Sequence, residues 1–556
     1  MNPTGKYVPF PVIKLDDRQW PSRQVTKAPV WCSVDLRDGN QAIPVPMTVA
    51  KKIEMFKLLV QIGFKEIEVG FPAASPTEFE FVRRLIDEGL IPDDVTIQVL
   101  VQAREDLIKR TVESLMGAKR VIIHMYNSTS PSQRKIVFGM EKPQIVELAI
   151  QGTKWVKKHA EKLRAQGTEV LFQYSPESFS ATEVDFALEV CEAVMDVWKP
   201  TPQNKMILNL PDTVEVAMCN VYADQVEWFC RHLAFRDSVI ISLHAHNDRG
   251  TGVAATEFGI LAGADRVEGT LFGNGERTGN TCLVTVALNM YGQGINPELD
   301  FSDIDHVREV YEGCTEMEVS PRHPYAGKLV FTAFSGSHQD AIRKGLRSRA
   351  FAFNAATSCA VLWDVPYLPI DPEDLGRRYE EVIRVNGQSG KGGIAYLLET
   401  ECGMRLPKDM LREFGAIAGR KIDALGREVT APDLKQMFWA EYIERETPYR
   451  LLKFQTSNEG GECHCWSKIM LNAEQLDLPG KGNGTIHAFV CSLQKERINV
   501  SVLDYSEHTL GKDETAQAIC YVQLRIPDGS IRWGAGVDTN SELAPIRAII
   551  SALNRE

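Results

Sequence analysis

The sequence lacks the features that would place the protein in a membrane or in an oxidising compartment. No apolar run approaches the ~18 residues that a helix needs to cross a bilayer. The first residues, 1–7, do not combine a basic stretch with an apolar one, as a signal peptide does. The 12 cysteines in 556 residues are too sparse for a disulfide scaffold, and no two are spaced Cys-x-x-Cys. We therefore expect a soluble, cytoplasmic protein with reduced thiols.

The sequence also lacks an excess of basic residues. It has 62 Lys and Arg against 74 Asp and Glu, a net charge of −12. A general nucleic-acid-binding protein needs a basic face to contact phosphates, so the composition argues against that class. The hydrophobic and charged shares, 44% and 24%, are those of soluble globular proteins. A length of 556 residues exceeds one ordinary core and predicts several domains.

Between residues 30 and 291, short apolar runs alternate with amphipathic stretches. This alternation predicts a parallel sheet, because a crossover helix must return the chain to the same edge. An open doubly wound sheet is the alternative, but the turn after the first run, Asp35–Asn40, is not the Gly-rich turn of that fold. Eight runs in about 260 residues fit a closed (β/α)8 barrel, the TIM-barrel class. The predicted strands are Val30–Val34, Lys65–Val69, Thr96–Val101, Arg120–His124, Val170–Tyr174, Met206–Leu210, Val239–His244 and Arg266–Leu271.

The remaining chain divides into two regions. Residues 297–448 show helical patterns, and residues 449–556 show two-residue alternation typical of antiparallel strands. In the last region we expect strands at Thr485–Val490, Ile498–Val502 and Ala518–Ile526, and a final helix at Ser541–Asn554. We therefore predict three domains: a barrel over residues 1–296, a helical linker region over residues 297–448 and an α+β domain over residues 449–556.

Two histidines, His244 and His246, mark the end of the seventh predicted strand. Side chains two residues apart in a strand point to the same side, so the two imidazoles could bind one divalent cation. An isolated pair of this kind is more often two ordinary polar residues of a loop. The end of a barrel strand is, however, where active sites form in this fold, which favours the metal site.

Oxygen ligands could come from two neighbouring strand ends. Asp38 follows the first predicted strand, and Asn280 follows the eighth, after a Gly-rich stretch that begins at Gly273. Taken singly, Asp and Asn in loops usually stabilise turns. Because the carboxyl ends of all strands of a parallel barrel lie at one mouth, both residues are candidates for the same site as the histidines.

Other polar residues fall at the same ends of predicted strands. Arg37 could stabilise an oxyanion beside Asp38. His124 ends the fourth strand, Glu177 follows the fifth and Thr213 follows the sixth. A lone histidine is more often structural than catalytic, so only the joint placement makes these residues informative. Together they suit a metal that polarises a bidentate 2-oxo acid for attack by a carbon nucleophile.

At this point the sequence resembles a known family, the 2-isopropylmalate synthases of the superfamily that condenses acetyl-CoA with 2-oxo acids. The resemblance covers nearly the whole chain. It is carried by Trp20–Pro21, Asp35–Gln41, Glu68–Pro72, Ser175–Glu177, His244–Asp248 and Gly275–Asn280.

The resemblance implies a role for each candidate residue. Asp38, His244, His246 and Asn280 would bind the metal. Arg37 would stabilise the enolate or keto oxygen, His124 and Thr213 would contact the oxo acid, and Glu177 would hold the substrate or a water. The helical region of the family reaches into the partner's barrel, which implies that His338 and Tyr367 are supplied there. From the residues alone, His338 is an ordinary helix-start residue and Tyr367 a packing residue.

The resemblance also implies the cofactors and partners. These are a divalent metal (Mg²⁺, Mn²⁺ or Zn²⁺), acetyl-CoA and 3-methyl-2-oxobutanoate as substrates, and K⁺ as an activator. A homodimer and feedback inhibition by leucine, bound in the last domain, are implied as well.

Three alternatives stay open at this point. The chain could be a citramalate or homocitrate synthase that uses another 2-oxo acid. It could be a metal-dependent aldolase or lyase on the same barrel, which would need no acetyl-CoA. It could be a leucine-binding regulator without activity, although that would leave the polar residues at the strand ends unexplained.

Overall fold

A computed structural model describes residue 6 and residues 10–333, 335–355, 362–379, 391–425, 429–511 and 516–555. The chain forms two compact units. The first comprises Met1–Phe331 with Pro369–Arg378, and the second comprises Thr332–Leu368 with Tyr379–Glu556.

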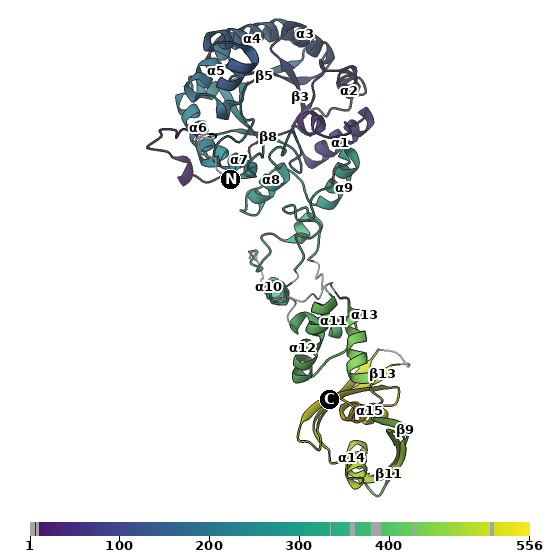
Figure 1. The fold of residues 1–556 in the computed structure, drawn as a ribbon. Helices are drawn as coiled ribbons and strands as arrows, with labels where there is room; N and C mark the ends of the chain where they lie inside the picture. Colours follow the sequence, from purple (N-terminus) through teal and green to yellow (C-terminus); the bar gives the residue numbers. More distant parts are fainter. Residues whose placement is uncertain are drawn as a thin grey trace. The chain divides into compact units, whose positions relative to one another are not determined.

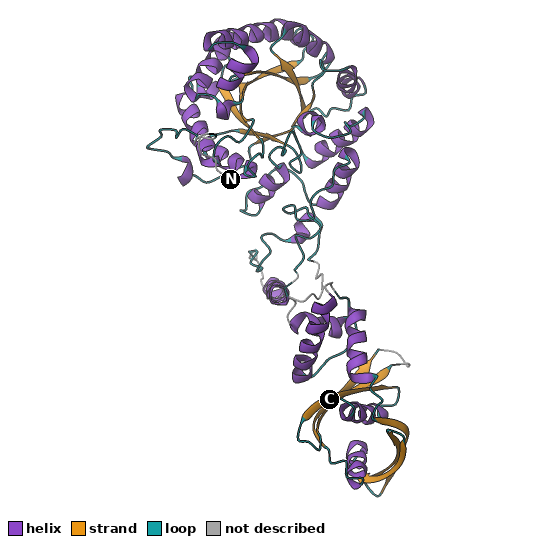
Figure 2. Ribbon diagram, in the orientation of Figure 1, coloured by secondary structure: helices purple, strands orange, loops and turns teal. Residues whose placement is uncertain are grey.

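The first unit contains a closed barrel of eight parallel strands (Figures 1 and 2). Each strand pairs with the next one along the chain, and β8 pairs with β1. The (β/α)8 barrel is therefore confirmed, and each of the eight predicted strand positions overlaps an observed strand. The strands are β1 (Val30–Ser33), β2 (Glu66–Gly70), β3 (Thr96–Gln102), β4 (Arg120–Ser128), β5 (Glu169–Glu177), β6 (Met206–Asp212), β7 (Val239–Ala245) and β8 (Arg266–Gly269).

Helices follow the strands and surround the barrel, as Figure 2 shows. Local signals define the first of them: the hydroxyl of Thr48 accepts a hydrogen bond from the backbone N–H of Lys51, and Gly63 ends the helix at φ 113°. The helices are α1 (Val49–Ile62), α2 (Pro76–Asp87), α3 (Glu105–Ser114), α4 (Lys142–Arg164), α5 (Val184–Trp198), α6 (Cys219–His232), α7 (Gly252–Leu261), α8 (Leu283–Tyr291) and α9 (Ile304–Thr315).

The second unit contains most of the predicted helical region, whose residues 297–331 and 369–378 belong to the first unit, and the predicted α+β domain. The helices of the first part are α10 (Gly336–Ala355), α11 (Lys391–Thr400), α12 (Lys408–Leu425) and α13 (Ala431–Phe438). Two antiparallel sheets follow, in the strand orders β11-β10-β9 and β12-β13-β14. Their elements are β9 (Tyr449–Glu459), β10 (Glu462–Leu471), β11 (Glu474–Gly482), α14 (Thr485–Lys495), β12 (Ser501–Leu510), β13 (Gln517–Arg525), β14 (Ile531–Asp538) and α15 (Leu543–Leu553).

One predicted strand of the last domain is wrong. Thr485–Val490 begins helix α14 and is not a strand. Ile486, Phe489, Val490 and Leu493 have the spacing of one helical face, and the last three of these are buried. The predicted strand at Ile498–Val502 overlaps β12 only in its last two residues, whereas the strand at Ala518–Ile526 and the final helix are confirmed.

Strand β13 joins the two parts of the second unit, because both of its faces are buried. Cys520 and Val522 belong to the core shared with α14 and α15. Ile519 and Tyr521, on the other face, belong to the core shared with α11, α12 and α13. Arg555 adds a polar link, since its guanidinium lies 2.7 Å from Glu413 of α12. The helices and the C-terminal sheet therefore pack as one body.

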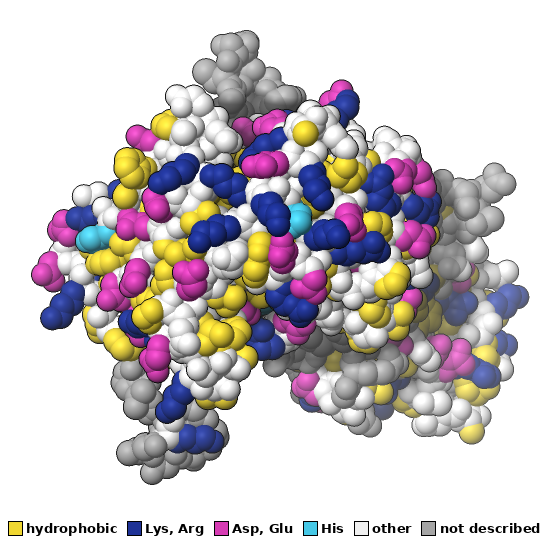
Figure 3. All heavy atoms as spheres, turned by 90° about the horizontal axis from the view of Figure 1, so that it is seen from above, with side chains coloured by type: hydrophobic (Ala, Val, Ile, Leu, Met, Phe, Trp, Pro, Cys, Tyr) yellow, Lys and Arg dark blue, Asp and Glu magenta, His cyan; other side chains and the backbone are white. Residues whose placement is uncertain are grey.

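The expectations about thiols and membranes are partly tested. The eleven cysteines among the described residues are all free. Within the same residues, no helix combines the length and the apolar character that a membrane span requires. Figure 3 shows one face of the molecule, on which Lys and Arg are interspersed with Asp and Glu, so this face presents no continuous basic surface for a nucleic acid.

Candidate metal centre

The three residues with the strongest sequence signal meet at the mouth of the barrel. Nε2 of His244 lies 3.1 Å from Oδ2 of Asp38, and Nε2 of His246 lies 3.5 Å from the same oxygen. One ligand atom from each residue lies within 4.8 Å of the other two, and all three residues are buried. Two imidazoles and a carboxylate at this spacing form a chelating set for a divalent cation.

Two local backbone features bring these ligands together. His244 lies near the end of β7, and His246 follows two residues later, so the two rings face the same side. Asp38 lies on a π-helical turn, Asp35–Gly39, that begins soon after β1 ends. Such turns are rare and occur mostly at functional sites. This turn places the Asp38 carboxylate beside β7, although 206 residues separate Asp38 and His244.

Asn280 lies beside the triad because the preceding loop folds tightly. It forms an isolated bridge with His246. Two glycines allow the loop to close: a Cβ atom at Gly279 would lie 1.8 Å from the carbonyl oxygen of Gly273, and one at Gly275 would lie 2.1 Å from the Asn280 side chain. Oδ1 of Asn280 is buried and has no hydrogen-bond partner among the described residues. An orphaned buried oxygen beside the triad fits a further metal ligand.

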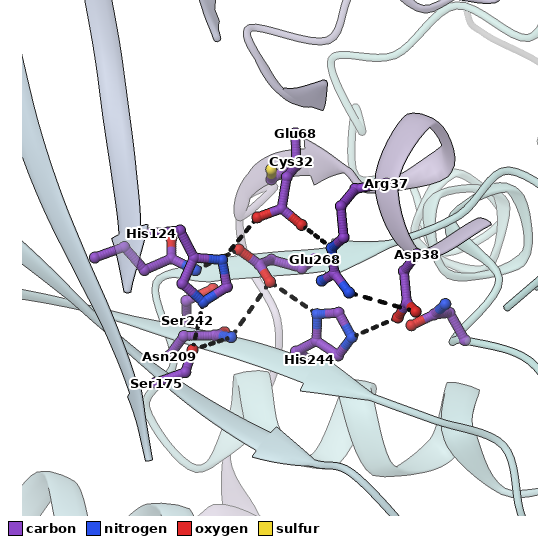
Figure 4. A network of polar contacts seen from close by, with 12 residues as sticks. Cys32, Arg37, Asp38, Glu68, His124, Ser175, Asn209, Ser242, His244 and Glu268 are labelled. Carbon is purple, nitrogen blue, oxygen red and sulfur yellow. Dashed lines mark hydrogen bonds and ion pairs between the residues drawn. The ribbon is translucent and has the colours of Figure 1, made fainter. Parts of the chain in front are cut away.

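The charges around the triad also fit a divalent cation. A connected, mostly buried network joins the mouth to the barrel interior (Figure 4), and its carboxylates outnumber its guanidiniums by two when the histidines are counted as neutral. A bound dication would balance this excess. The carboxylates are those of Asp38, Glu66, Glu68 and Glu268, and the guanidiniums are those of Arg37 and Arg266.

The pKa values of the triad follow from this environment. Burial opposes the charged form of Asp38, but the charge of Arg37 and the hydrogen bond from His244 outweigh it and hold the pKa of that carboxyl well below its usual range. Burial and the neighbouring His244 lower the pKa of His246 to about 4. Burial also acts to lower the pKa of His244, yet its bonds to Asp38 and Glu268 raise it to about 9. Asp38 is therefore charged and His246 neutral at pH 7, which are the forms that bind metals, whereas His244 carries a proton that a bound cation would displace.

Two further carboxylates, Glu68 and Glu268, form hydrogen bonds to predicted site residues from the barrel interior. Glu268 accepts a hydrogen bond from Nδ1 of His244 at 2.8 Å. Glu68 is hydrogen-bonded to Nε of Arg37 and lies 2.7 Å from Nδ1 of His124. Both side chains are fully buried. Sequence reasoning did not assign either residue to the site.

His124 belongs to a closed ring of hydrogen bonds across the barrel (Figure 4). Both of its nitrogens are engaged, Nδ1 by Glu68 and Nε2 by the hydroxyl of Ser175 at 2.7 Å. The amide of Asn209 links Ser175 to Glu268, and the amide of Gln98 links Glu268 to Glu68, which closes the ring. His124 borders the cavity above the ring, but its nitrogens serve the network.

A cavity of about 190 Å³ opens above the triad. Glu177 and Thr213 line it together with Arg37 and His124, so the structure brings all four to the mouth. Glu177 accepts a hydrogen bond from the hydroxyl of Ser128, and the hydroxyl of Thr213 accepts one from the backbone N–H of Ser178 at 2.9 Å. The side chains that point into the cavity are therefore fixed by neighbouring strand ends.

His338 and Tyr367 belong to the second unit, whereas the other eight predicted site residues belong to the first. Their rings stack on each other with centroids 4.0 Å apart. The Tyr367 side chain is 61% exposed, and its backbone has φ 66°, a conformation that non-glycine residues seldom adopt. The structure thus places them together as an exposed aromatic pair, and Tyr367 is not the buried packing residue that its sequence context favours.

A sequence signal for the missed network exists within the strands. Polar residues recur two positions apart in otherwise apolar runs, as in Glu66 and Glu68 of β2 and in Arg266 and Glu268 of β8. This spacing places both members of a pair on one side of the strand, and in a barrel that side is the interior. Barrel interiors are usually filled by Val, Ile and Leu, so charged residues at these positions indicate a functional layer.

Comparison with family models divides the chain into three matched regions. Residues 28–310 match the model described as HMGL-like, which covers the barrel. Residues 328–399 match the "alpha-isopropylmalate synthase, post-catalytic domain-like" model, and residues 428–556 match the "LeuA allosteric (dimerisation) domain" model.

Three whole proteins similar to this chain carry the name 2-isopropylmalate synthase. The protein from Parafrankia sp. (strain EAN1pec) is 54% identical over 558 residues, with 100% of this chain and 97% of the relative covered. The one from Pseudomonas syringae pv. tomato is 56% identical over 555 residues with the same coverages. The one from Clostridium acetobutylicum is 54% identical over 558 residues, with 99% of each chain covered.

Proposed function

Because the chain belongs to the 2-isopropylmalate synthase family, we propose that it condenses acetyl-CoA with 3-methyl-2-oxobutanoate and water. The products are (2S)-2-isopropylmalate and CoA, and the reaction is the committed step of leucine biosynthesis. The buried cluster of Asp38, His244 and His246, in a chain that aligns with these enzymes over its full length, carries this proposal. We propose Mg²⁺, Mn²⁺ or Zn²⁺ at the cluster, with Asn280 as a fourth ligand, and K⁺ as an activator.

The residues around the cluster have distinct tasks in this reaction. A divalent cation at the cluster supplies Lewis-acid polarisation of a keto group. Arg37 lies beside Asp38, 3.4 Å from its carboxylate, where its remaining N–H groups stabilise negative charge on the substrate oxygen. Glu177 faces the cavity with a carboxylate that accepts a proton from the acetyl methyl group or orients the water. Thr213 and His124 border the bound oxo acid.

The cavity wall favours a branched apolar side chain on the oxo acid. Leu100, Tyr126 and Pro211 give it an apolar lining. A second carboxylate, as in 2-oxoglutarate, would need a further cation. Of the two arginines that line the described cavity, Arg37 is engaged by Glu68 and, in this proposal, by the keto oxygen, and Arg277 is paired with Asp248. This arrangement supports 3-methyl-2-oxobutanoate over 2-oxoglutarate, the substrate of a homocitrate synthase.

Release of CoA thiol, followed with 3-methyl-2-oxobutanoate, pyruvate and 2-oxoglutarate, tests the function. We expect kcat/KM for 3-methyl-2-oxobutanoate to exceed that for pyruvate by about 10-fold or more, because each methylene in an apolar pocket contributes a factor of roughly 10 to 200. A chelator should abolish the activity, and omission of acetyl-CoA should leave no turnover of the oxo acid. Preference for pyruvate would instead indicate a citramalate synthase, and turnover without acetyl-CoA would indicate an aldolase or lyase.

We propose the C-terminal domain as the site of feedback inhibition by leucine, at a pocket of about 660 Å³ between α14, β12 and α15. Gly484 is the N-cap of α14 and provides no side-chain cap, so the N–H groups of the first helical turn suit an α-carboxylate. Glu507 and Glu542 suit an α-ammonium group. Val490 and Val502 are part of an apolar wall that suits the isobutyl side chain.

The Val502→Phe variant tests this pocket. Val502 is half-buried on its wall, so a larger ring should fill space that leucine needs without disturbing the barrel. We expect the leucine concentration for half-inhibition to rise at least tenfold while kcat stays within about twofold, since overlap with a bound ligand costs more than 1.4 kcal/mol. A matched Val12→Phe change, at an exposed site, should alter neither. Unchanged inhibition in Val502→Phe would place leucine elsewhere.

The assembly follows from the family as well. We propose a homodimer in which His338 and Tyr367 complete the site of the partner's barrel. The match of residues 428–556 to an allosteric dimerisation domain and the exposure of Tyr367 support this. We propose that the functional regions are the barrel over residues 1–296, the helical region over residues 297–448 and the α+β domain over residues 449–556. We also propose a cytoplasmic location, which the free cysteines fit.

A further inference from the structure

Glu268 lies one layer below the metal centre and does not border the cavity. It sits in β8, is fully buried, and its carboxylate accepts hydrogen bonds from five side chains. The five donors come from β3, β5, β6, β7 and from β8 itself. They are Gln98 at 3.0 Å, Gln173 at 2.7 Å, Asn209 at 3.3 Å, His244 at 2.8 Å and Arg266 at 2.7 Å.

The hydrogen bond between Glu268 and His244 orients one of the proposed metal ligands. Because Nδ1 of His244 donates its hydrogen to Glu268, Nε2 is the nitrogen that faces Asp38 and the metal. An imidazole that binds metal through one nitrogen is oriented, and made more basic, by a carboxylate at the other. No second acceptor lies within hydrogen-bond distance of Nδ1 among the described residues. Glu268 therefore holds the ring at Nδ1, while Asp38 contacts it at Nε2.

The remaining bonds tie the same carboxylate to the substrate side of the site. The amide of Asn209 donates to Glu268 and also to the hydroxyl of Ser175, which bonds to His124. The amide of Gln98 bridges Glu268 and Glu68, and Glu68 holds Arg37. Displacement of Glu268 would thus disturb the metal ligand, His124 and Arg37 together.

We propose that Glu268 is a positioning residue that sets the metal affinity of the site by fixing His244 and holds the substrate-facing groups through the same hydrogen-bond network. The inference rests on the proposed metal site, but not on which oxo acid the enzyme uses. Glu268 does not line the described cavity and is not part of the Asp38, His244 and His246 cluster, so it acts through other residues.

The Glu268→Gln variant tests the role with little change in volume. The new amide group would bring a donor to a place where five donors already converge, so it cannot satisfy them. Outer-shell partners of this kind typically affect metal affinity 10- to 100-fold. We expect the Kd for Mn²⁺, measured from the electron paramagnetic resonance signal of the free ion with no substrate present, to rise about 10- to 100-fold. Saturating Mn²⁺ should restore part of kcat.

Glu227→Gln is the matched control. Glu227 is nearly as buried, at 1% exposure, and accepts hydrogen bonds from two backbone N–H groups and from Arg231, but it lies on the outer helix α6. Its replacement should lower the melting temperature and leave the Kd for Mn²⁺ unchanged. Glu268→Asp, which keeps the charge on a shorter side chain, should give an intermediate Kd and serves if Glu268→Gln does not fold.

The outcomes separate this proposal from the proposed function. A Kd for Mn²⁺ within about twofold of the parent value in Glu268→Gln, or in Glu268→Asp if only that variant folds, would overturn the positioning role, whatever happens to the melting temperature. If the parent protein itself binds no Mn²⁺, the metal site and the proposed function fail first.

Discussion

The His246→Ala variant is expected to fold like the parent protein and to lose its response to divalent metal. Nδ1 of His246 has no hydrogen-bond partner among the described residues, and Nε2 approaches only Asp38, at 3.5 Å. Removal of the ring therefore breaks no strong hydrogen bond. It removes one of three metal ligands, however, and a catalytic metal supplies several kcal/mol, so kcat should fall by roughly 10³.

Thermal unfolding with and without metal measures the binding defect independently of activity. For the parent protein, metal at 100 times its Kd should add about 2.7 kcal/mol to the free energy of unfolding. For His246→Ala this stabilisation should disappear. His159→Ala is the control, because His159 is equally buried, also has an unpartnered Nδ1 and lies on the outer helix α4. A full metal response in His246→Ala would contradict the proposed ligand set.

The Arg37→Lys variant is expected to retain the metal and lose catalysis. The guanidinium of Arg37 contacts Glu68 through Nε and Asp38 through Nη1 at the same time, and a lysine ammonium is a single point charge that cannot reproduce this fork. The positive charge near Asp38 and Glu68 remains, so the metal Kd should change less than about threefold. Loss of an oriented donor to the developing oxyanion should lower kcat by about 10²–10³.

Two measurements on one preparation separate these effects. The Kd for Mn²⁺ reports the metal site, and CoA thiol release at saturating substrates reports kcat. Arg134→Lys is the matched control: the Arg134 side chain is 11% exposed against 12% for Arg37, and it forms a two-pronged ion pair with Glu183. It should lose stability without loss of kcat. Equal kcat losses in the two variants would show that the effect of Arg37 is structural.

Much of the site could be predicted from the sequence because its residues lie at the ends of regular strands. His244 and His246 share a face through the two-residue period of β7, and strand order in a closed barrel brings Asp38 and Asn280 to the same mouth. The strand predicted at Thr485–Val490 failed for a related reason. Six residues that alternate and include Thr, Ile and Val fit a strand or one face of a helix, and packing of α14 against β11 selects the helix.

The sequence by itself determined the barrel and the cluster of Asp38, His244 and His246, since hydrophobic periodicity and the order of the strands can be read directly along the chain. Only the tertiary structure decided which buried groups support those ligands. Glu268 and Glu68 contact His244, Arg37 and His124 across the barrel interior, over separations of 24 to 56 residues. Such pairings depend on which inward-facing side chains lie at the same level along the barrel axis. That level is set by the register between strands, which the pattern of one strand does not show.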